Sequence, residues 1–584
     1  MVADESADRA ATLTLSAFNW FNAIFQVLTR RAQRRFRERD WAGGRRDATE
    51  RFDLYERALD LAETWLDATL GPRTLSPALW VAAKTRFAAL VAHRYDVERA
   101  ETFYNSVTRR MLSTVGIDRE VEFFHLHPKP VAPHDTADVV RAYASPAGDT
   151  ASLVRTLLGD AELGAPWEDI DRDARLIAQE IDLCLWPLIG TEGSCTIEVV
   201  TAVFYRRKEA YIVGRILVDE RPIPLLIPLV HGDGGVYADT VLLHESDAGI
   251  VFSFAYSYFF VDVERYDALI HFLHTIIPRA DMAELFTALG YNRHGKTEFY
   301  RDLHRFVHVS KEQFDIAPGL EGAVMIAFTL PNYDSVLKVI KDRPCFLRSS
   351  NQTPKTITKE KVRKQYDFVA HRDRAGRMVD TQEFENLRFR RKRFSKALLG
   401  EFALAAKEGV EITDNYVVIR HVYVQRRVVP LPFYFQREKD PEAIRRVLID
   451  FGWFLKDIAA SGVFPADLFN TWNYGVTHWG RVVLYDYDDV LPMEKIRFRE
   501  KPVPRDDGEL DRPEEDWIVA GEDDFFLDEM ERYSGIPKPL KGVFRSAHGD
   551  LFTLRFWTAL MDRQRTGEIF SVIPYDRAKS FRRR

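Results

Sequence analysis

The hydrophobic pattern of this chain changes twice, and these two changes limit the folds that it can adopt. In roughly the first 190 residues, apolar side chains recur at helical spacing, as in segments 15–28 and 52–66. Residues 196–204, 211–218, 222–230 and 236–243 are instead strand-like, and the polar turn 206–209 and the glycine-rich turn 232–235 divide them into two hairpins. Helical spacing returns over residues 266–277 and 282–289. The N-terminal part is therefore predicted to be a helical unit with an inserted antiparallel sheet.

The second change falls near residue 310, where strand-like and helical segments begin to alternate. Residues 323–329 and 335–340 predict two strands across a turn at Pro331. The segments that follow predict a loop at 348–364, a helix at 380–407, strands at 416–424 and 427–435, a helix at 442–460 and a strand at 480–485. We expect an α+β protein with two domains, residues 1–310 and 311–584.

Composition narrows the classes of protein to which the chain can belong. Of its 584 residues 46% are hydrophobic and 29% charged, which is typical of globular proteins and excludes a collagen-like or mostly disordered chain. The net charge of −6 provides no overall basic field, so we expect no nucleic-acid partner. The longest strongly apolar run, residues 250–261, is shorter than the roughly 18 residues that a membrane helix needs, so we expect no membrane partner.

The cysteine and histidine residues predict no metal or disulfide framework. Cys184, Cys195 and Cys345 are odd in number and widely spaced, which favours the reducing cytoplasm as the compartment. His125, His127 and His134 lie close together, but prolines separate them, so we favour a polar loop over a zinc site.

The C-terminal half carries an ordered series of residues that is typical of phosphoryl transfer. A loop with two glycines precedes a strand centred on Lys338, and such a loop brings backbone N–H groups close to phosphate. Asp467, Asn473 and Asp486 then follow, and Asp486 ends an apolar strand. Protein kinases use this order: the first Asp positions the substrate hydroxyl, and the Asn and the last Asp hold Mg²⁺. Each residue alone fits a turn or a cap, but the series favours a phosphotransferase.

Several segments resemble the isocitrate dehydrogenase kinase/phosphatase family. The most specific is the block at residues 373–386, Asp-Arg-Ala-Gly-Arg-Met-Val-Asp-Thr-Gln-Glu-Phe-Glu-Asn. The other matching segments are 210–214, 296–298, 317–319, 328–331, 338–342, 419–421 and 485–488. The resemblance is strong over roughly residues 195–490.

This resemblance implies a regulatory domain followed by a bilobal protein-kinase-like domain. It implies an enzyme that phosphorylates a serine of NADP-dependent isocitrate dehydrogenase and removes that phosphate, switching flux between the citric acid cycle and the glyoxylate bypass. The cofactors would be ATP, with ADP in the phosphatase reaction, and Mg²⁺. AMP or a related metabolite is the expected regulator, and the sequence leaves open whether the chain is a homodimer.

The resemblance also implies a role for each site residue. Lys338 would bind phosphate, Asp467 would be the catalytic Asp, Asn473 and Asp486 would bind Mg²⁺, and Asp380 would serve the phosphatase reaction. The ATP loop would consist of Ala317, Pro318, Gly319, Leu320, Glu321, Gly322 and Ala323.

Three features keep alternatives open. Asp467 and Asn473 are six positions apart, where kinases have about five, and no His-Arg pair precedes the Asp, so an ATP-binding regulatory pseudokinase is the alternative. A helical scaffold bound through the acidic segment 506–529 would explain the charges but not the Lys, Asp and Asn series. Asp380 also fits a helix N-cap, with Glu383 completing a capping box.

Overall fold

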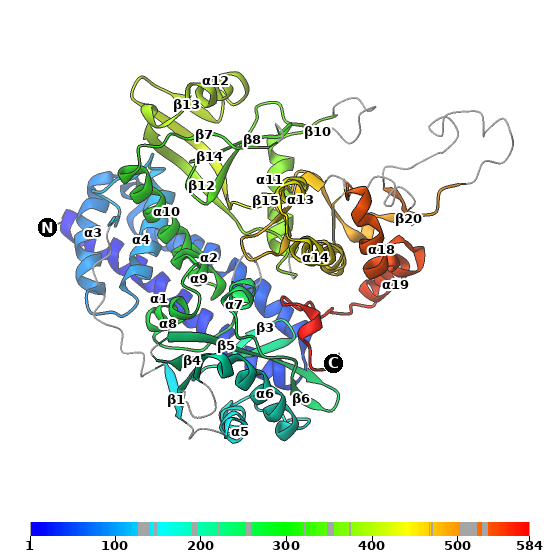
Figure 1. Ribbon diagram of the computed structural model, residues 1–584. Helices are drawn as coiled ribbons and strands as arrows, with labels where there is room; N and C mark the ends of the chain where they lie inside the picture. The colour runs from blue at the N-terminus through cyan, green and yellow to red at the C-terminus, as the bar shows by residue number, and fades with distance from the viewer. Residues whose placement is uncertain are drawn as a thin grey trace, which may run out of the picture.

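The computed structural model describes most of the chain, and its N-terminal part is a bundle of long helices (Figure 1). The bundle consists of α1 (Val2–Arg37), α2 (Trp41–Leu70), α3 (Pro77–Val91) and α4 (Val97–Leu112). Its core is aromatic, with Phe18, Trp80 and Phe103 each 1% exposed or less. The predicted helices at 15–28 and 52–66 are confirmed. The described residues are 2–126, 139–144, 149–189, 196–219, 221–252, 258–319, 322–346, 355–372, 375–465, 468, 471–502, 523–527 and 535–582.

An antiparallel sheet follows the bundle and carries helices on both faces. Its strands run in the order β1-β2-β4-β5-β6, with β3 beside β4. The strands are β1 (Val140–Ala144), β2 (Thr196–Val200), β3 (Phe204–Arg206), β4 (Glu209–Val218), β5 (Arg221–Gly232) and β6 (Gly235–Ala238). Successive residues of a strand point to opposite faces, so Ile212 packs with α5 (Thr150–Asp160) and α6 (Ile170–Ile189). Val213 packs on the other face with α7 (Glu245–Phe252), α8 (Tyr266–Ile276) and α9 (Met282–Ala288).

Both predicted hairpins are confirmed, with shifted ends. Residues 196–204 form two strands, β2 and β3, and both pair with β4. The last strand of the second hairpin, β6, ends at Ala238, earlier than predicted. The helices that complete the N-terminal part are α7 (Glu245–Phe252), α8 (Tyr266–Ile276), α9 (Met282–Ala288) and α10 (Asn292–Val309).

The C-terminal part has two lobes, of which the first is a second antiparallel sheet. The strands run in the order β12-β14-β9-β8-β7, with β13 (Val410–Ile412) beside β14. Their bounds are β7 (Asp315–Ile316), β8 (Met325–Thr329), β9 (Ser335–Ile340), β12 (Thr381–Arg390) and β14 (Tyr416–Arg426). Two helices accompany this sheet, α11 (Lys359–Arg372) and α12 (Lys396–Ala405), and the short strands β10 (Cys345–Phe346) and β11 (Lys355–Thr356) pair with each other.

The second lobe is mainly helical and packs around α14 (Pro441–Ala460). The short strands of this part of the chain are β15 (Val429–Pro430), β16 (Val463–Pro465), β17 (Tyr474–Val476), β18 (Val482–Leu484) and β19 (Val490–Pro492). The remaining elements are α13 (Leu431–Arg437), β20 (Arg497–Arg499), β21 (Asp524–Phe526), α18 (Lys541–His548) and α19 (Leu554–Arg565). The α+β class and the bilobal C-terminal part are therefore as expected.

The helix predicted at 380–407 is wrong over its first half, which forms strand β12. Phe384, Leu387 and Phe389 are its buried apolar residues. Asn386 has a φ of 53°, and the buried side of the strand shifts by one residue there. Phe384 and Leu387 are therefore three positions apart, which is the spacing of a helix.

Two other predictions need correction. The strand predicted at 427–435 is mostly helix α13, because Pro430 and Pro432 occupy its start, where a missing N–H costs nothing. The loop predicted at 348–364 already contains the first turns of α11, and part of it lies outside the described residues.

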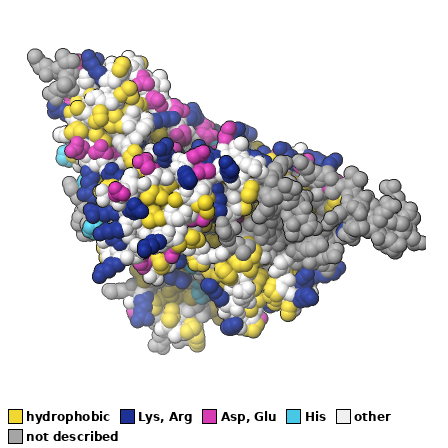
Figure 2. Space-filling model, turned by 90° about the horizontal axis from the view of Figure 1, so that it is seen from above, with side chains coloured by type: hydrophobic (Ala, Val, Ile, Leu, Met, Phe, Trp, Pro, Cys, Tyr) yellow, Lys and Arg dark blue, Asp and Glu magenta, His cyan; other side chains and the backbone are white. Residues whose placement is uncertain are grey.

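Side chains of several chemical types lie next to one another on the surface of the molecule. On the face seen from above, acidic, basic and apolar side chains are interspersed (Figure 2). A search of the described residues for a helix long and apolar enough to cross a membrane found none.

Candidate active site

A large cleft lies between the two lobes of the C-terminal part. Its volume is about 520 Å³, and β8, β9, the segment after β14 and the residues around β18 form its walls. Lys338, Asn473 and Asp486 all line it. The structure thus brings together three residues that lie up to 148 positions apart in the sequence.

The loop before β8 closes one side of this cleft. Ala317, Pro318, Gly319, Gly322 and Ala323 line the cavity, whereas Leu320 and Glu321 lie outside the described residues. Gly319 has a φ of 150°, and a Cβ on Gly322 would lie 2.6 Å from the carbonyl oxygen of Met325. Both positions therefore require glycine, the residue type that lets backbone N–H groups approach phosphate closely in a phosphate-binding turn.

Lys338 links the two lobes at the floor of the cleft. It pairs with Ala327 on β8 and with Tyr423 on β14, so the centre of the sheet holds its backbone. The side chain is nearly buried, and Nζ donates a hydrogen bond to the carbonyl oxygen of Tyr485 at 2.8 Å. The ammonium group therefore points toward the strand end that carries Asp486.

Three residues whose oxygen atoms could bind a metal ion lie in the same cleft as this lysine. Asn473 ends a short turn after helix α14 and strand β16, and its carbonyl oxygen accepts a hydrogen bond from Tyr485 N at 3.1 Å. Asp486 and Asp488 follow β18, and both line the cleft. Burial, and then the charge of Asp486, raise the pKa of Asp488 well above its ordinary value, whereas Lys338 lowers it.

This set of donors suits a hard divalent cation. Asp488 Oδ1 is shielded from solvent and has no hydrogen-bond partner among the described residues. An amide oxygen and two carboxylates are the ligands that Mg²⁺ prefers, and a cation there would offset the repulsion between Asp486 and Asp488. Sequence reasoning named Asn473 and Asp486 as the ligands and Asp488, from the Asp-Tyr-Asp spacing at the end of the strand, only as the substitute for Asp486.

The predicted catalytic Asp467 lies outside the described residues. Its neighbourhood is partly defined, because Tyr474 OH donates to the carbonyl oxygen of Leu468 at 3.0 Å. Trp472 lines the cleft and meets Phe433 edge-on, with ring centroids 4.9 Å apart.

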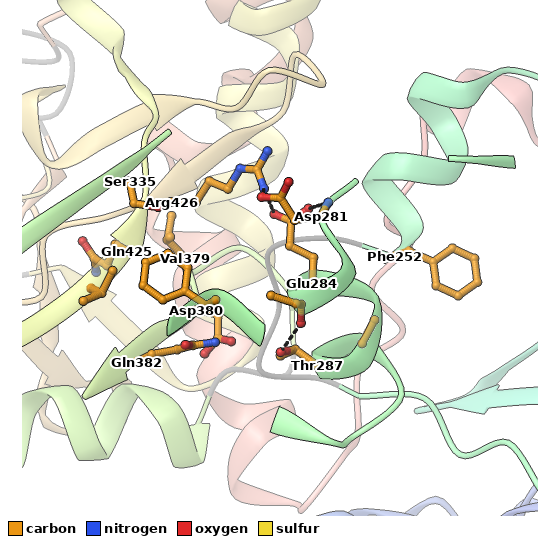
Figure 3. A pocket seen from close by; sticks show the side chains of 14 residues that line it. Phe252, Asp281, Glu284, Thr287, Ser335, Val379, Asp380, Gln382, Gln425 and Arg426 are labelled. Atoms are coloured by element: carbon orange, nitrogen blue, oxygen red, sulfur yellow. Dashed lines mark hydrogen bonds and ion pairs between the residues drawn. The ribbon is translucent and has the colours of Figure 1, made fainter. Parts of the chain in front are cut away.

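Asp380 lies in a second, smaller cavity of about 80 Å³ (Figure 3). Helix α9 supplies the opposite wall with Glu284 and Thr287, together with its N-cap residue Asp281. The capping-box interpretation of Asp380 is wrong, because the residues that follow it form strand β12 and not a helix.

The two cavities are neighbours. Gln425 and Arg426, at the end of β14, line both. The backbone before Asp380 runs beside β18, since Val379 N donates to the carbonyl oxygen of Leu484 at 3.0 Å. Asp380 therefore follows a segment bonded to the strand that ends at Asp486.

Arg426 joins this region to the N-terminal part of the chain. Its guanidinium lies 2.8 Å from Glu284 and also pairs with Asp281 (Figure 3). It lies 3.0 Å from Asp334 as well. Burial raises the pKa of Glu284 to about 7, although the Arg426 charge opposes this shift. Sequence reasoning did not find this cluster; its one signal was Asp281 and Glu284 at capping-box spacing, and that capping box is present in α9.

The N-terminal part holds one cluster of metal-ligand type among the described residues, Glu98, His294 and Glu298. Arg301 already bridges its two carboxylates, at 3.0 Å from Glu98 and 2.6 Å from Glu298. A guanidinium thus occupies the place of a cation. Of the three histidines considered from the sequence, His127 and His134 lie outside the described residues.

Taken together, a bilobal domain with a glycine loop, a cleft lysine and an Asn/Asp oxygen set defines a kinase-like phosphotransferase. The chain belongs to the isocitrate dehydrogenase kinase/phosphatase family. The model of the "Isocitrate dehydrogenase kinase/phosphatase (AceK), regulatory domain" matches residues 11–311, and the model of the AceK kinase domain matches residues 312–577.

Curated relatives support this assignment over almost the whole chain. The isocitrate dehydrogenase kinase/phosphatase of Anaeromyxobacter sp. (strain Fw109-5) is 41% identical over 98% of this chain and 97% of its own length. That of Polaromonas sp. (strain JS666 / ATCC BAA-500) is 33% identical over 98% of this chain and 93% of its own length.

Proposed function

We propose that this chain is a bifunctional protein serine kinase and phosphoprotein phosphatase that acts on NADP-dependent isocitrate dehydrogenase. The observation that carries the proposal is the convergence of Lys338, Asn473 and Asp486 on one cleft in a chain of this family. The same observation favours catalysis over the pseudokinase alternative, because the phosphate-binding and metal-binding positions are all filled by competent side chains. Such an enzyme would direct carbon between the citric acid cycle and the glyoxylate bypass from the cytoplasm.

The nucleotide would be ATP, with ADP serving the phosphatase reaction. In the kinase direction Lys338 would offset phosphate charge, and Asp467 would orient the serine hydroxyl and accept its proton. Mg²⁺, when bound by Asn473 and Asp486 with Asp488 beside them, would neutralise charge on the phosphate oxygens. In the phosphatase direction Asp380 would orient or deprotonate the attacking water.

The remaining parts of the proposal concern organisation and control. We divide the chain into a regulatory domain at 1–310 and a catalytic domain at 311–584, in line with the limits of the two family matches. AMP or a related metabolite is the proposed regulator, and a homodimer is one proposed assembly.

A pair of assays tests the function. The purified chain should transfer labelled γ-phosphate from ATP to a serine of isocitrate dehydrogenase, and should release phosphate from the labelled product when ADP is supplied. Binding of ATP without either reaction would favour the pseudokinase. A chain that performs the kinase reaction alone would leave Asp380 without its proposed role.

A further inference from the structure

Arg377 lies where the chain passes from the second lobe to the sheet of the first lobe. Residues 377–379 run beside strand β18 of the second lobe, and strand β12 of the first lobe begins at Thr381. Asp380 is the one residue between these two segments. Its position therefore depends on how firmly the residues before it are held against the second lobe.

The backbone of residues 377–379 is bonded to β18 through both backbone groups of Leu484. Leu484 N donates to the carbonyl oxygen of Arg377 at 2.8 Å, and Val379 N donates to the carbonyl oxygen of Leu484 at 3.0 Å. Tyr487 OH also donates to the carbonyl oxygen of Val379. Since Leu484 is the last residue of β18 and leads directly toward Asp486, these bonds connect the Asp380 segment with the metal-binding side of the cleft.

The side chain of Arg377 holds the same segment against helix α14. It is 2% exposed, and its guanidinium donates to both oxygens of Asp450, at 2.8 Å each, and to Asp457 at 2.9 Å. Nη1 also donates to the carbonyl oxygen of Val482 at 3.1 Å. This pattern requires the planar, forked guanidinium, so a lysine could not reproduce it.

Helix α14 places the two aspartates for this contact. Asp450 and Asp457 are separated by about two helical turns, so they lie on the same face of α14. Asp450 also accepts a hydrogen bond from Val482 N at 2.7 Å and thereby joins β18 to the helix directly. Burial acts to raise the pKa of Asp450, but the charge of Arg377 and the hydrogen bonds outweigh it, and the pKa is lowered. Arg377 and Asp450 therefore form an ion pair in which both partners are charged.

Arg577 of the C-terminal segment adds a second cation to this cluster. It donates to the other carboxylate oxygen of Asp457 at 2.9 Å, and its guanidinium carbon lies 3.9 Å from the ring centroid of Trp453. Its side chain is 18% exposed, against 3% for Arg377, so it can be changed with less disturbance of the core. The α14 ion-pair network thus consists of Arg377, Asp450, Asp457 and Arg577.

The C-terminal segment that carries Arg577 is fixed to the N-terminal part of the chain. Tyr575 OH and Ser580 Oγ each donate to Asp239, which follows β6, at 2.7 Å. Lys579 pairs with Asp247 on α7. Figure 1 shows this segment running back from α19 toward the N-terminal sheet. The α14 ion-pair network is therefore supported from outside the catalytic lobe.

The metal-binding residues of the cleft have a support of their own. Strand β18 also pairs with β17, which follows Asn473 directly, and Tyr474 lies opposite Leu484 in that pair. Asn473 and Asp486 should therefore stay together when the α14 ion-pair network is weakened. Asp380 would lose one of the two attachments between which it lies.

We propose that Arg377 is a positioning residue for Asp380. Through its bonds to α14 and β18 it fixes the position of Asp380 relative to Asp486, and Arg577 supports it by holding Asp457. The inference rests on the proposed phosphatase role of Asp380. It goes beyond that proposal, because neither arginine lines the cleft or the Asp380 cavity. The phosphatase reaction should depend on the α14 ion-pair network more strongly than the kinase reaction does.

The main test is Arg377→Lys, which keeps the positive charge but cannot form the forked bonds. Because misplacement of a catalytic group by about 1 Å can cost about 10²-fold, we expect the phosphatase kcat to fall by about tenfold or more. KM for phosphorylated isocitrate dehydrogenase and the kinase kcat should change little. Rates are compared per folded molecule, with the folded fraction measured by circular dichroism. Arg565→Met, which removes an exposed arginine of α19, is the control and should leave both reactions unchanged.

Arg577→Met weakens the same network while it retains Arg377, and it provides the test if Arg377→Lys fails to fold. It should lower the phosphatase kcat in the same selective way but by a smaller factor. Arg577→Lys restores a cation beside Asp457 and should recover most of the loss. Variants in which both reactions fall by the same factor would overturn the proposal, because they would show a purely structural role.

Hydrogen exchange gives a readout that needs neither activity. By mass spectrometry, a peptide that contains Val379 should exchange faster in Arg377→Lys and in Arg577→Met, whereas a peptide that contains β17 should exchange as in the natural chain. Unchanged exchange at Val379 in both variants would overturn the proposal. Faster exchange there, in a chain whose natural form has no phosphatase activity, would support the positioning role of Arg377 and refute the proposed function.

Discussion

The interlobe cleft and the Asp380 cavity share a wall but differ in how they are built. The cleft of about 520 Å³ takes its lining from the kinase-like domain, with a lysine, an amide and carboxylates on strands and strand ends. The cavity of about 80 Å³ takes half of its lining from the N-terminal part, mainly from α9, and Gln425 and Arg426 separate the two. We therefore expect nucleotide binding to depend on the kinase-like domain alone. We expect the position of the water that attacks phosphoserine to depend also on the contact between the two domains.

The largest effect is expected from the metal-binding side of the cleft. Asp486→Ala removes a carboxylate from the Asn473, Asp486 and Asp488 set, so both reactions should be lost, because both use the nucleotide. Circular dichroism should show an unchanged fold. Asp315→Ala, an exposed carboxylate on β7, is the control. Metal-dependent turnover that survives would move the ligand role to Asp488.

A change confined to the second cavity should separate the two activities. Removal of a positioned acid or base typically costs about 10²–10⁴-fold, so Asp380→Ala should lose phosphatase activity by that order and keep appreciable kinase activity. Asp467→Ala should instead affect the kinase reaction most. Each variant is assayed with unmodified isocitrate dehydrogenase and ATP, and with the phosphorylated protein.

The outcome for Asp380→Ala decides whether the comparison between the cavities is correct. Equal loss of both reactions, together with lost ATP affinity, would show that Asp380 supports the cleft structurally. Asp380→Asn is the matched variant, since it keeps the shape and removes the charge.

A smaller effect, shared by both reactions, is expected at the cleft lysine. Lys338→Met keeps a long apolar side chain but removes the ammonium group that donates to Tyr485, so ATP use should fall by about 10²–10³-fold in both directions. Lys341→Met, just beyond the same strand and paired with Glu401 at 3.3 Å, is the control. Unchanged rates in both directions would rule out a phosphate-binding role for Lys338.

The cleft could be predicted from sequence because its residues sit at ends and centres of regular elements. Lys338 lies on a strand that the hydrophobic pattern predicts, and Asp486 lies two residues beyond the end of the apolar strand β18. In a kinase-like fold, residues in this order lie on elements that surround the nucleotide. Their order along the chain therefore predicts most of their positions around the cleft. The position of the extra residue between Asp467 and Asn473 could not be predicted from the sequence alone.

The second cavity could not be predicted, since no local pattern encodes it. The sequence predicted a helix from about residue 380, with Asp380 as one candidate for its N-cap. The positive φ of Asn386, which gives Phe384 and Leu387 a helix-like spacing within a strand, could not be predicted. The facing wall comes from α9, about a hundred positions earlier in the chain. Arg426 reaches Asp281 and Glu284 only through the packing of two domains.

The smallest expected effect concerns this domain contact and its dependence on pH. Glu284 has its pKa raised to about 7 by burial, against an ordinary value of 4.5. A carboxyl group with a raised pKa binds more protons in the folded than in the unfolded state between these values. The free energy of unfolding should therefore fall as pH rises through the window from about 4.5 to about 7.

Glu284→Gln cannot ionise, so its stability should lack this part of the decline. Relative to the natural chain, the variant should gain about 1–3 kcal/mol between pH 4.5 and pH 7, as measured by denaturant unfolding at both values. The gain is bounded because Arg426 at 2.8 Å favours the charged form of Glu284, and because Arg426 keeps Asp281 and Asp334 as partners in the variant. Glu442→Gln, an exposed residue at the start of α14, should follow the natural chain at both pH values. Parallel curves for Glu284→Gln and the natural chain would mean that the Arg426 contact keeps Glu284 ionised throughout, and that the wall shared by the two cavities is a fixed ion pair with no proton to exchange.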